Sequence, residues 1–326
     1  MSTKAHLYWI DWMKVLGMYF IIAGHMFSAG NEYLYTFSVS LFFAISGFLC
    51  HHESDNIVFW NKLFRNLILP CLLICLIILA LETLARLVTN KMVWSLIPMR
   101  LFNILIGNQG KGVVGGGIGM CWFIYTLVIC KILYQYVRNK YLQTTIVLLC
   151  VAIAIIYNEI GNYLYNSILN VSLAYPAFMG GILLKVLEKK SIHGIARYVV
   201  MILLSLLFVI GITPLNGSVR MYGALYGNSI ILFFLGVVAG TIGIYTLSLM
   251  LQRYKPKHLA MLSMGTILIL GFHNFFLIAY KLFFKTFRTT FLDYSASLVI
   301  LLAFIPIILL TKKYFPVLLG FRGKTA

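Results

Sequence analysis

The sequence predicts an all-α polytopic membrane protein with about ten transmembrane helices, and three observations support this class. Hydrophobic residues make up 61% of the 326 residues, and charged residues only 10%. The mean hydropathy of +0.94 implies more apolar surface than a soluble fold can bury. The apolar runs are continuous rather than alternating, which excludes a transmembrane β-barrel. No long polar stretch interrupts them, so we expect one membrane domain over residues 1–326.

Ten apolar runs approach the length of about 20 residues that a membrane-spanning helix needs. They cover residues 8–28, 33–51, 63–88, 118–137, 144–160, 171–187, 198–213, 228–251, 259–282 and 292–310. An additional weakly apolar stretch, residues 93–106, contains Pro98 and Arg100 and is too short to span comfortably. We expect a short re-entrant or interfacial helix there.

The charge balance predicts the orientation of the helices. The chain has 26 Lys and Arg residues against 8 Asp and Glu, a formal net charge of +18. If both termini are cytoplasmic, about two thirds of the basic residues fall on the inner side, as the positive-inside rule requires. We therefore expect a multi-pass protein of the cell (inner) membrane. No basic patch is interleaved with exposed aromatic residues, so a nucleic-acid partner is not expected.

The six cysteines lie in or beside apolar runs: Cys50, Cys71, Cys75, Cys121, Cys130 and Cys150. None forms a Cys-x-x-Cys pair, and no histidine cluster accompanies them. This pattern favours buried free thiols, and we expect no metal site.

The first span contains three ionisable residues, Asp11, Lys14 and His25. Lys14 and His25 project from nearly the same helix face and lie roughly 16 Å apart along the axis. Asp11 is three residues before Lys14, within reach for an ion pair. Charged groups are costly inside a membrane and usually face a cavity or a partner, which favours a functional polar stripe. The alternative is an interfacial Asp11–Lys14 anchor with a hydrogen-bonded core histidine.

Two further places in the N-terminal part of the chain carry candidate residues. Ser46 precedes Gly47 in the second span without a Gly-x-Ser-x-Gly motif, which favours close helix packing over a nucleophilic serine. Lys62 and Arg65 form a basic juxtamembrane stretch, suited either to positive-inside anchoring or to phosphate binding.

The ninth predicted span contains the adjacent polar residues His273 and Asn274. They could hydrogen-bond helices together or line a cavity, and the sequence leaves both roles open.

These motifs together resemble the acyltransferase 3 family, and more closely its short, membrane-only branch of sugar O-acetyltransferases (fucose 4-O-acetylase-like). The strongest likeness is the Lys14-x10-His25 pair that follows Ile10-Asp11-Trp12. The likeness extends over most of the chain, through residues 38–48, the basic stretch at 62–70, Cys121-Trp122-Phe123-Ile124 and Leu270-Gly271-Phe272-His273.

The resemblance implies a membrane O-acyltransferase with about ten helices. His25 corresponds to the family's catalytic histidine and Lys14 to its basic partner, which is arginine in many relatives. Lysine keeps the charge but loses the two-pronged geometry of arginine. The donor would be acetyl-CoA or another acyl-CoA, with its phosphates held by Lys14, Lys62 and Arg65. The substrate-side candidates are Asp11, Ser46, Trp122, His273 and Asn274.

The expected acceptor is a hydroxyl group of a cell-envelope or lipid-linked carbohydrate, reached within the lipid bilayer. His25 would act either as a general base or as a transient acyl carrier. Its orienting partner is open among His273, Ser46 and Asn274. The identity of the acyl group, the modified hydroxyl and the existence of a homodimer are also open.

Two other function classes fit the sequence less well. A transporter or flippase of lipid-linked sugars or small anions could use the same polar stripe, but the sequence lacks internal repeats. A structural membrane scaffold would leave the polar stripe unexplained.

Overall fold

The computed structural model describes residues 6–26, 28–107, 119–160, 166–188 and 194–320. Regular structure within these ranges is helical, apart from one isolated bridge between Arg220 and Leu225. The α-helices are α1 (Tyr8–Gly24), α2 (Asn31–Tyr35), α3 (Ser38–Leu49), α4 (Asn56–Leu63), α5 (Leu69–Val88), α6 (Leu96–Ile106), α7 (Met120–Tyr136), α8 (Lys140–Ile160), α9 (Asn166–Glu188), α10 (Ile195–Asn216), α11 (Ile230–Leu251), α12 (Leu259–Met264), α13 (Thr266–Phe283) and α14 (Thr290–Tyr314). The prediction of an all-α polytopic membrane protein is confirmed.

Eight helical segments in the described ranges are long and apolar enough to cross a membrane. The two other predicted spans form shorter helices, α1 and α7, each of 17 residues. At about 1.5 Å per residue, 17 residues cover roughly 26 Å, slightly less than a typical hydrocarbon core. The short α6 occupies the stretch expected to be re-entrant or interfacial. It packs against α5, where its buried Arg100 pairs with Glu82.

The third predicted span starts earlier than expected and continues without a break from Asn56 to Val88. A π-helical turn, η1 (Phe64–Ile68), joins α4 to α5 just before Pro70. Proline has no N–H and its ring clashes with the carbonyl four residues earlier, and the wider turn accommodates this. The Leu69 N–H accordingly bonds the carbonyl of Phe64, five residues back.

Two predicted spans are not single helices. The second is divided at Thr36–Phe37 into α2 and α3, and the ninth at Gly265 into α12 and α13. Thr36 and Phe37 pack where Cβ atoms on Gly236 and Gly240 of α11 would clash with them. The continuous apolar runs gave no sign of either break, because these contacts join distant parts of the chain.

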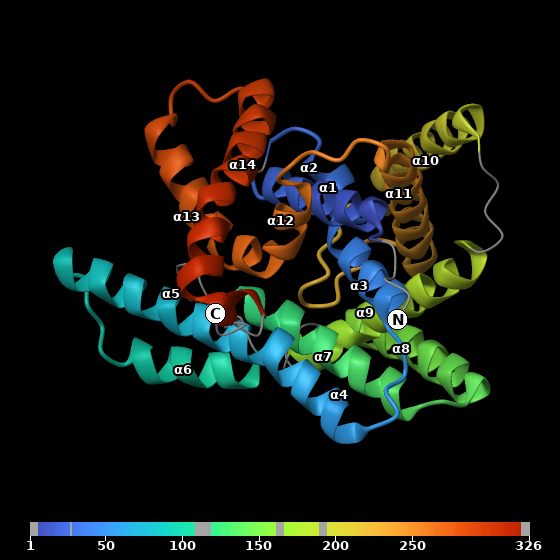
Figure 1. The fold of residues 1–326 in the computed structure, drawn as a ribbon, viewed down its shortest axis with the longest axis horizontal. Helices are drawn as coiled ribbons and strands as arrows, with labels where there is room; N and C mark the ends of the chain where they lie inside the picture. Colours follow the sequence, from blue (N-terminus) through green and yellow to red (C-terminus); the bar gives the residue numbers. More distant parts are fainter. Residues whose placement is uncertain (1–5, 27, 108–118, 161–165, 189–193, 321–326) are drawn as a thin grey trace.

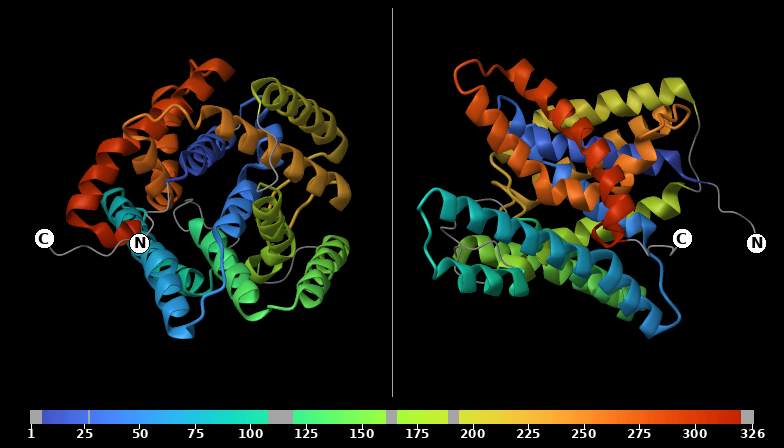
Figure 2. Two further views of the ribbon diagram at one scale, coloured as in Figure 1. Left: turned by 45° about the vertical axis from the view of Figure 1, so that its right-hand side comes forward. Right: turned by 60° about the vertical axis from the view of Figure 1, so that its left-hand side comes forward.

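The helix α1 lies centrally and is surrounded by neighbours from much later in the sequence. It contacts α3, α11, α12, α13 and α14. Figures 1 and 2 show α1 between the α13–α14 pair and α11, while α4 to α8 lie together beside this assembly and contact it where α5 packs against α13. The polar stripe of α1 is therefore enclosed by protein on several sides.

A glycine contact fixes the position of α3. A Cβ atom on Gly47 would overlap the carbonyl oxygen of Phe178 in α9, and one on Gly181 would overlap that of Ala44 in α3. These two glycines let the helix backbones approach closely. The close packing expected at Gly47 is confirmed, and the neighbouring Ser46 faces a cavity instead.

Candidate active site

A cavity of about 450 Å³ lies between α1, α3, α4, η1, α7 and the α12–α13 junction. Most of its wall is apolar. The polar residues of the wall include Lys14, Ser46, His51, Glu53, Lys62, Asn66, Lys131 and Thr266. A cavity with an apolar body and a few convergent polar groups is the usual form of a small-molecule site.

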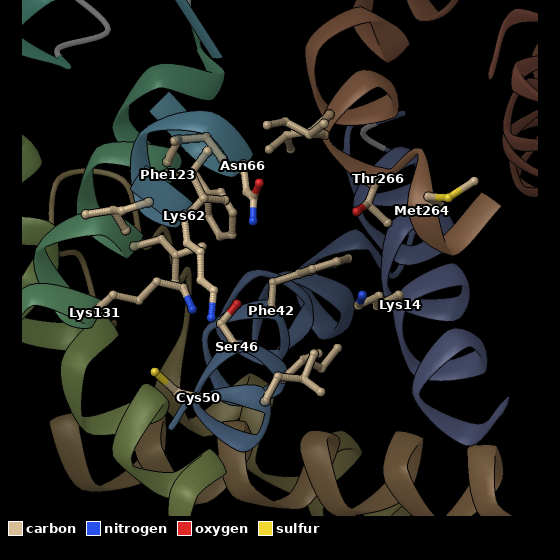
Figure 3. Close-up of a pocket in the computed structure, with 18 of the residues that line it drawn as sticks. Lys14, Phe42, Ser46, Cys50, Lys62, Asn66, Phe123, Lys131, Met264 and Thr266 are labelled. Atoms are coloured by element: carbon tan, nitrogen blue, oxygen red, sulfur yellow. The ribbon is translucent and has the colours of Figure 1, made fainter. Parts of the chain in front are cut away.

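Three lysines from three helices give the cavity its charge. Figure 3 shows Lys62 and Lys131 reaching into the cavity from one wall and Lys14 from the wall across it. The carboxylate of Glu53 lies 2.6 Å from Lys62 Nζ and 2.9 Å from His51 Nε2. The hydrogen bond from Lys62 lowers the pKa of Glu53. Lys14 and Lys131 form no ion pair within the described residues, so the cavity is suited to an anion.

The structure separates the predicted donor-binding residues. Lys14 and Lys62 line the same cavity, whereas Arg65 is exposed on η1 and is not part of its wall. Lys131 also lines the cavity and was not predicted, because its only signal in the sequence is a cation near the end of an apolar run. Asp11 pairs with His6 at 2.5 Å, not with Lys14 as expected from their spacing. Lys14 therefore forms no ion pair with Asp11, and its side chain lines the cavity.

The face of α1 that carries Lys14 leads to His25. Lys14, Met18 and Ile21 line the cavity, and His25 follows Ile21 by one helical turn. The sequence prediction that Lys14 and His25 share a face agrees with this geometry. His25 itself caps the C-terminus of α1, and its N–H bonds the carbonyl of Ile21 at 3.2 Å.

The helix α13 also leads from the cavity wall to the imidazole of His25. Thr266, Ile267 and Leu270 of α13 line the cavity, and His273 follows Leu270 by one turn. The rings of His25 and His273 stack with centroids 5.3 Å apart and planes 27° apart. The structure thus brings together two of the predicted site residues from opposite ends of the chain. Neither imidazole is part of the cavity wall itself.

Tyr35 in α2 is the hydrogen-bond partner of the His25 ring. Its hydroxyl oxygen lies 3.0 Å from Nδ1 of His25, and its ring meets the imidazole edge-on. The sequence candidates for this role were His273, Ser46 and Asn274. Of these, His273 stacks on the ring and Ser46 lines the cavity. Tyr35 carries no sequence signal, because the apolar run around it predicts one continuous second span.

A polar cluster holds the chain just after His25. Lys281 donates to the backbone carbonyl of His25 at 2.7 Å, and Arg288 donates to that of Met26 at 2.7 Å. Arg288 also pairs with Asp293 at 2.8 Å, and Ser28 donates to the same carboxylate. These contacts tie the end of α1 to α13 and α14, and thereby fix the backbone that carries the imidazole.

The two remaining substrate-side candidates lie outside the cavity wall. Trp122 in α7 packs against Tyr222 with ring centroids 5.7 Å apart. Asn274 is half-buried beside His273 and makes no hydrogen bond within the described residues. Their predicted roles stay predictions.

The cysteines are free thiols in the structure, and all except Cys50 are buried. The sulfur atoms of Cys71, Cys75 and Cys121 lie within 4.8 Å of one another, with 3.0 Å between Cys75 and Cys121. Sequence spacing did not indicate this grouping, because Cys121 belongs to a different helix from the other two.

Residues 7–311 match a family model described as an acyltransferase domain. No curated protein and no solved structure matches the chain.

Proposed function

Because the chain belongs to the acyltransferase 3 family, we propose that it is a membrane O-acyltransferase that uses acyl-CoA as donor. The group transferred is acetyl or another acyl group. The acceptor is a hydroxyl of a cell-envelope or lipid-linked carbohydrate, as in the sugar O-acetyltransferase branch that the motifs resemble. Family membership favours this function over the transporter alternative.

The observation that carries the proposal is the path along α1 from a cationic cavity to an imidazole. Coenzyme A carries several phosphate charges at one end and its thiol at the end of a long flexible arm. Lys14, Lys62 and Lys131 supply cations for the phosphates. The apolar wall formed by Met18, Ile21 and neighbouring side chains suits the arm. His25 lies roughly 16 Å along the helix from Lys14, where the thioester would arrive.

Tyr35 determines how the His25 ring can act. A neutral imidazole carries one proton, so one nitrogen donates and the other accepts. If Nδ1 donates its proton to Tyr35, Nε2 has the lone pair that a base or a nucleophile needs. We therefore assign Tyr35 as the positioning residue for His25 in the proposed reaction.

Labelled acyl transfer tests the proposed function. Purified protein in lipid vesicles would be incubated with acetyl-CoA labelled in the acetyl group and with a mixture of cell-envelope glycans and glycolipids. We expect the label to appear in an alkali-labile ester of the carbohydrate. Acyl-CoA that stays intact with every glycan fraction, while the protein is folded, would contradict the proposal.

Replacing Tyr35 with phenylalanine should lower kcat about 10-fold with little change in the KM for acyl-CoA. Phenylalanine keeps the edge-on ring contact but removes the hydroxyl 3.0 Å from His25 Nδ1. One hydrogen bond is worth about 0.5–1.5 kcal/mol, which sets the size of the effect. Initial rates over a range of acyl-CoA concentrations measure it. An unchanged kcat would show that the contact does not position the base.

Cysteine labelling tests the orientation that donor entry from the cytoplasm requires. The loop at residues 253–257 lies at the start of α1, where Trp12 donates to the carbonyl of Tyr254. We expect Lys257→Cys to react with a membrane-impermeant maleimide only after permeabilisation. Lys285→Cys, in the exposed α13–α14 connection, should react in intact cells. Labelling of Lys257→Cys in intact cells would contradict the predicted orientation and place this loop outside the cell.

A further inference from the structure

The hydrogen bonds of His273 determine which of its ring nitrogens is protonated. Nδ1 lies 3.0 Å from the carbonyl oxygens of Ile269 and Leu270. A carbonyl oxygen only accepts hydrogen bonds, so Nδ1 must carry the proton. The residue is 2% exposed and forms no ion pair with a carboxylate of the described chain. A neutral ring is therefore favoured, because an unpaired charge is costly at such a depth.

The other nitrogen of His273 is consequently an acceptor. In a neutral ring protonated at Nδ1, Nε2 carries a lone pair. This Nε2 atom is buried and has no hydrogen-bond partner among the described protein groups. Buried polar atoms normally find a partner, so the atom requires a donor that the described chain does not supply. A water molecule or the hydroxyl of a substrate can be that donor.

The position of the ring favours a substrate hydroxyl. His273 stacks on His25, and both rings follow cavity-lining residues, Leu270 and Ile21, by one turn. An acyl group that reaches His25 therefore arrives beside the stacked ring of His273. If Nδ1 of His25 donates its proton to Tyr35, Nε2 of His25 is the nitrogen that reacts.

We propose that the two histidines divide the reaction, with His25 carrying the acyl group and His273 Nε2 accepting the proton of the acceptor hydroxyl. This division rests on the proposed function. Like His25, His273 then contacts the reacting atoms, and is a catalytic residue rather than a packing residue.

The first step transfers the acyl group to the protein. Nε2 of His25 forms a bond to the thioester carbonyl carbon, and the carbon–sulfur bond breaks. Coenzyme A leaves as a thiolate that takes a proton from water, and the acylated ring is a cation that keeps its Nδ1 proton at Tyr35.

The second step transfers the acyl group to the acceptor. The hydroxyl proton moves to His273 Nε2 while the hydroxyl oxygen bonds to the acyl carbon. The carbon–nitrogen bond breaks, and its electron pair returns to His25. His25 is then neutral, and His273 returns its proton to water, so that one ester and one CoA thiol are formed for each thioester and hydroxyl consumed.

Two assays separate the steps. The first measures exchange of labelled CoA into acyl-CoA without acceptor, which needs only His25. The second measures transfer to the carbohydrate acceptor.

The test variant is His273→Asn, whose side-chain amide can still donate to the Ile269 and Leu270 carbonyls but is not a base. A matched control is Phe275→Leu, on the exposed side of α13. Thermal unfolding in detergent confirms that each variant is folded.

We expect His273→Asn to keep CoA exchange within a few-fold of wild type and to lose transfer by about 10²–10⁴-fold. Phe275→Leu should keep both activities. Wild-type transfer rates in folded His273→Asn would mean that Nε2 binds water only, and would overturn the inference. Equal loss of exchange and transfer would assign His273 a structural role, as would a variant that fails to fold while His273→Gln keeps full transfer.

Failure of the proposed function gives a different result. Wild-type protein would then transfer no acyl group from acyl-CoA to any carbohydrate. Wild-type protein that transfers but does not exchange CoA would retain the function and overturn the division between the two histidines.

Discussion

Replacing His25 with glutamine should reduce acyl transfer by at least about 10²–10⁴-fold, the usual contribution of a catalytic base, and by more if His25 carries the acyl group. Glutamine has a similar length and can still hydrogen-bond Tyr35, but it is neither a base nor a nucleophile at neutral pH. A histidine that only packs helices would tolerate this change. The expected loss therefore distinguishes chemistry from structure.

Two measurements make the His25 result interpretable. Acyl-CoA binding, followed by isothermal titration, should be retained in His25→Gln, because Lys14, which would hold the donor phosphates, lies about three turns away along α1. His258→Gln, at the start of α12 and outside the cavity wall, serves as a matched control with normal transfer. Equal transfer by His25→Gln and wild type at matched membrane levels would show that this histidine is structural and that the mechanism is wrong.

The parts of the site that the sequence predicted are local in the chain. Lys14, Met18, Ile21 and His25 share one face because helix periodicity decides this within 12 residues, whatever surrounds the helix. The class of the fold followed from composition in the same way, since continuous apolar runs allow helices and little else in a membrane. Both conclusions need only the sequence and the periodicity of a helix.

The parts that the sequence did not predict depend on contacts between distant segments. Tyr35 reaches His25 only because the chain reverses after α1 and the second span breaks at Thr36–Phe37. Gly236 and Gly240 of α11 make that break possible, and they lie about 200 residues later. The hydropathy pattern is uniform over the break and contains no information about these distant glycines.

The composition of the cationic cavity also could not be predicted from the local sequence. Lys62 and Arg65 were equivalent in the sequence, as two cations three residues apart beside one span. Only the structure separates them, because Lys62 lines the cavity beside Lys131 and opposite Lys14, whereas Arg65 is not part of the cavity wall. Lys131 reaches the same cavity from α7, and no sequence pattern connects it with Lys14 or Lys62.

Replacing Lys14 with alanine should raise the KM for acyl-CoA about 10- to 100-fold, because a hydrogen bond to a charged group is worth roughly 1.5–3 kcal/mol. Lys14 forms no ion pair within the described chain, so its charge is available to a ligand phosphate. Lys131→Ala should change the KM in the same direction. Acceptor KM should change less in both variants, because neither lysine is near the imidazole pair.

Matched variants determine whether this effect belongs to the cavity. Lys14→Arg should retain part of the donor affinity, since it keeps the charge and changes only its geometry. Lys140→Ala removes an exposed cation from the start of α8, outside the cavity wall, and should leave the KM for acyl-CoA unchanged. Steady-state rates at varied acyl-CoA and saturating acceptor give all four values. If Lys14→Ala and Lys140→Ala have the same KM as wild type, the donor phosphates bind elsewhere, and the route along α1 from the lysines to His25 is not the path of the acyl group.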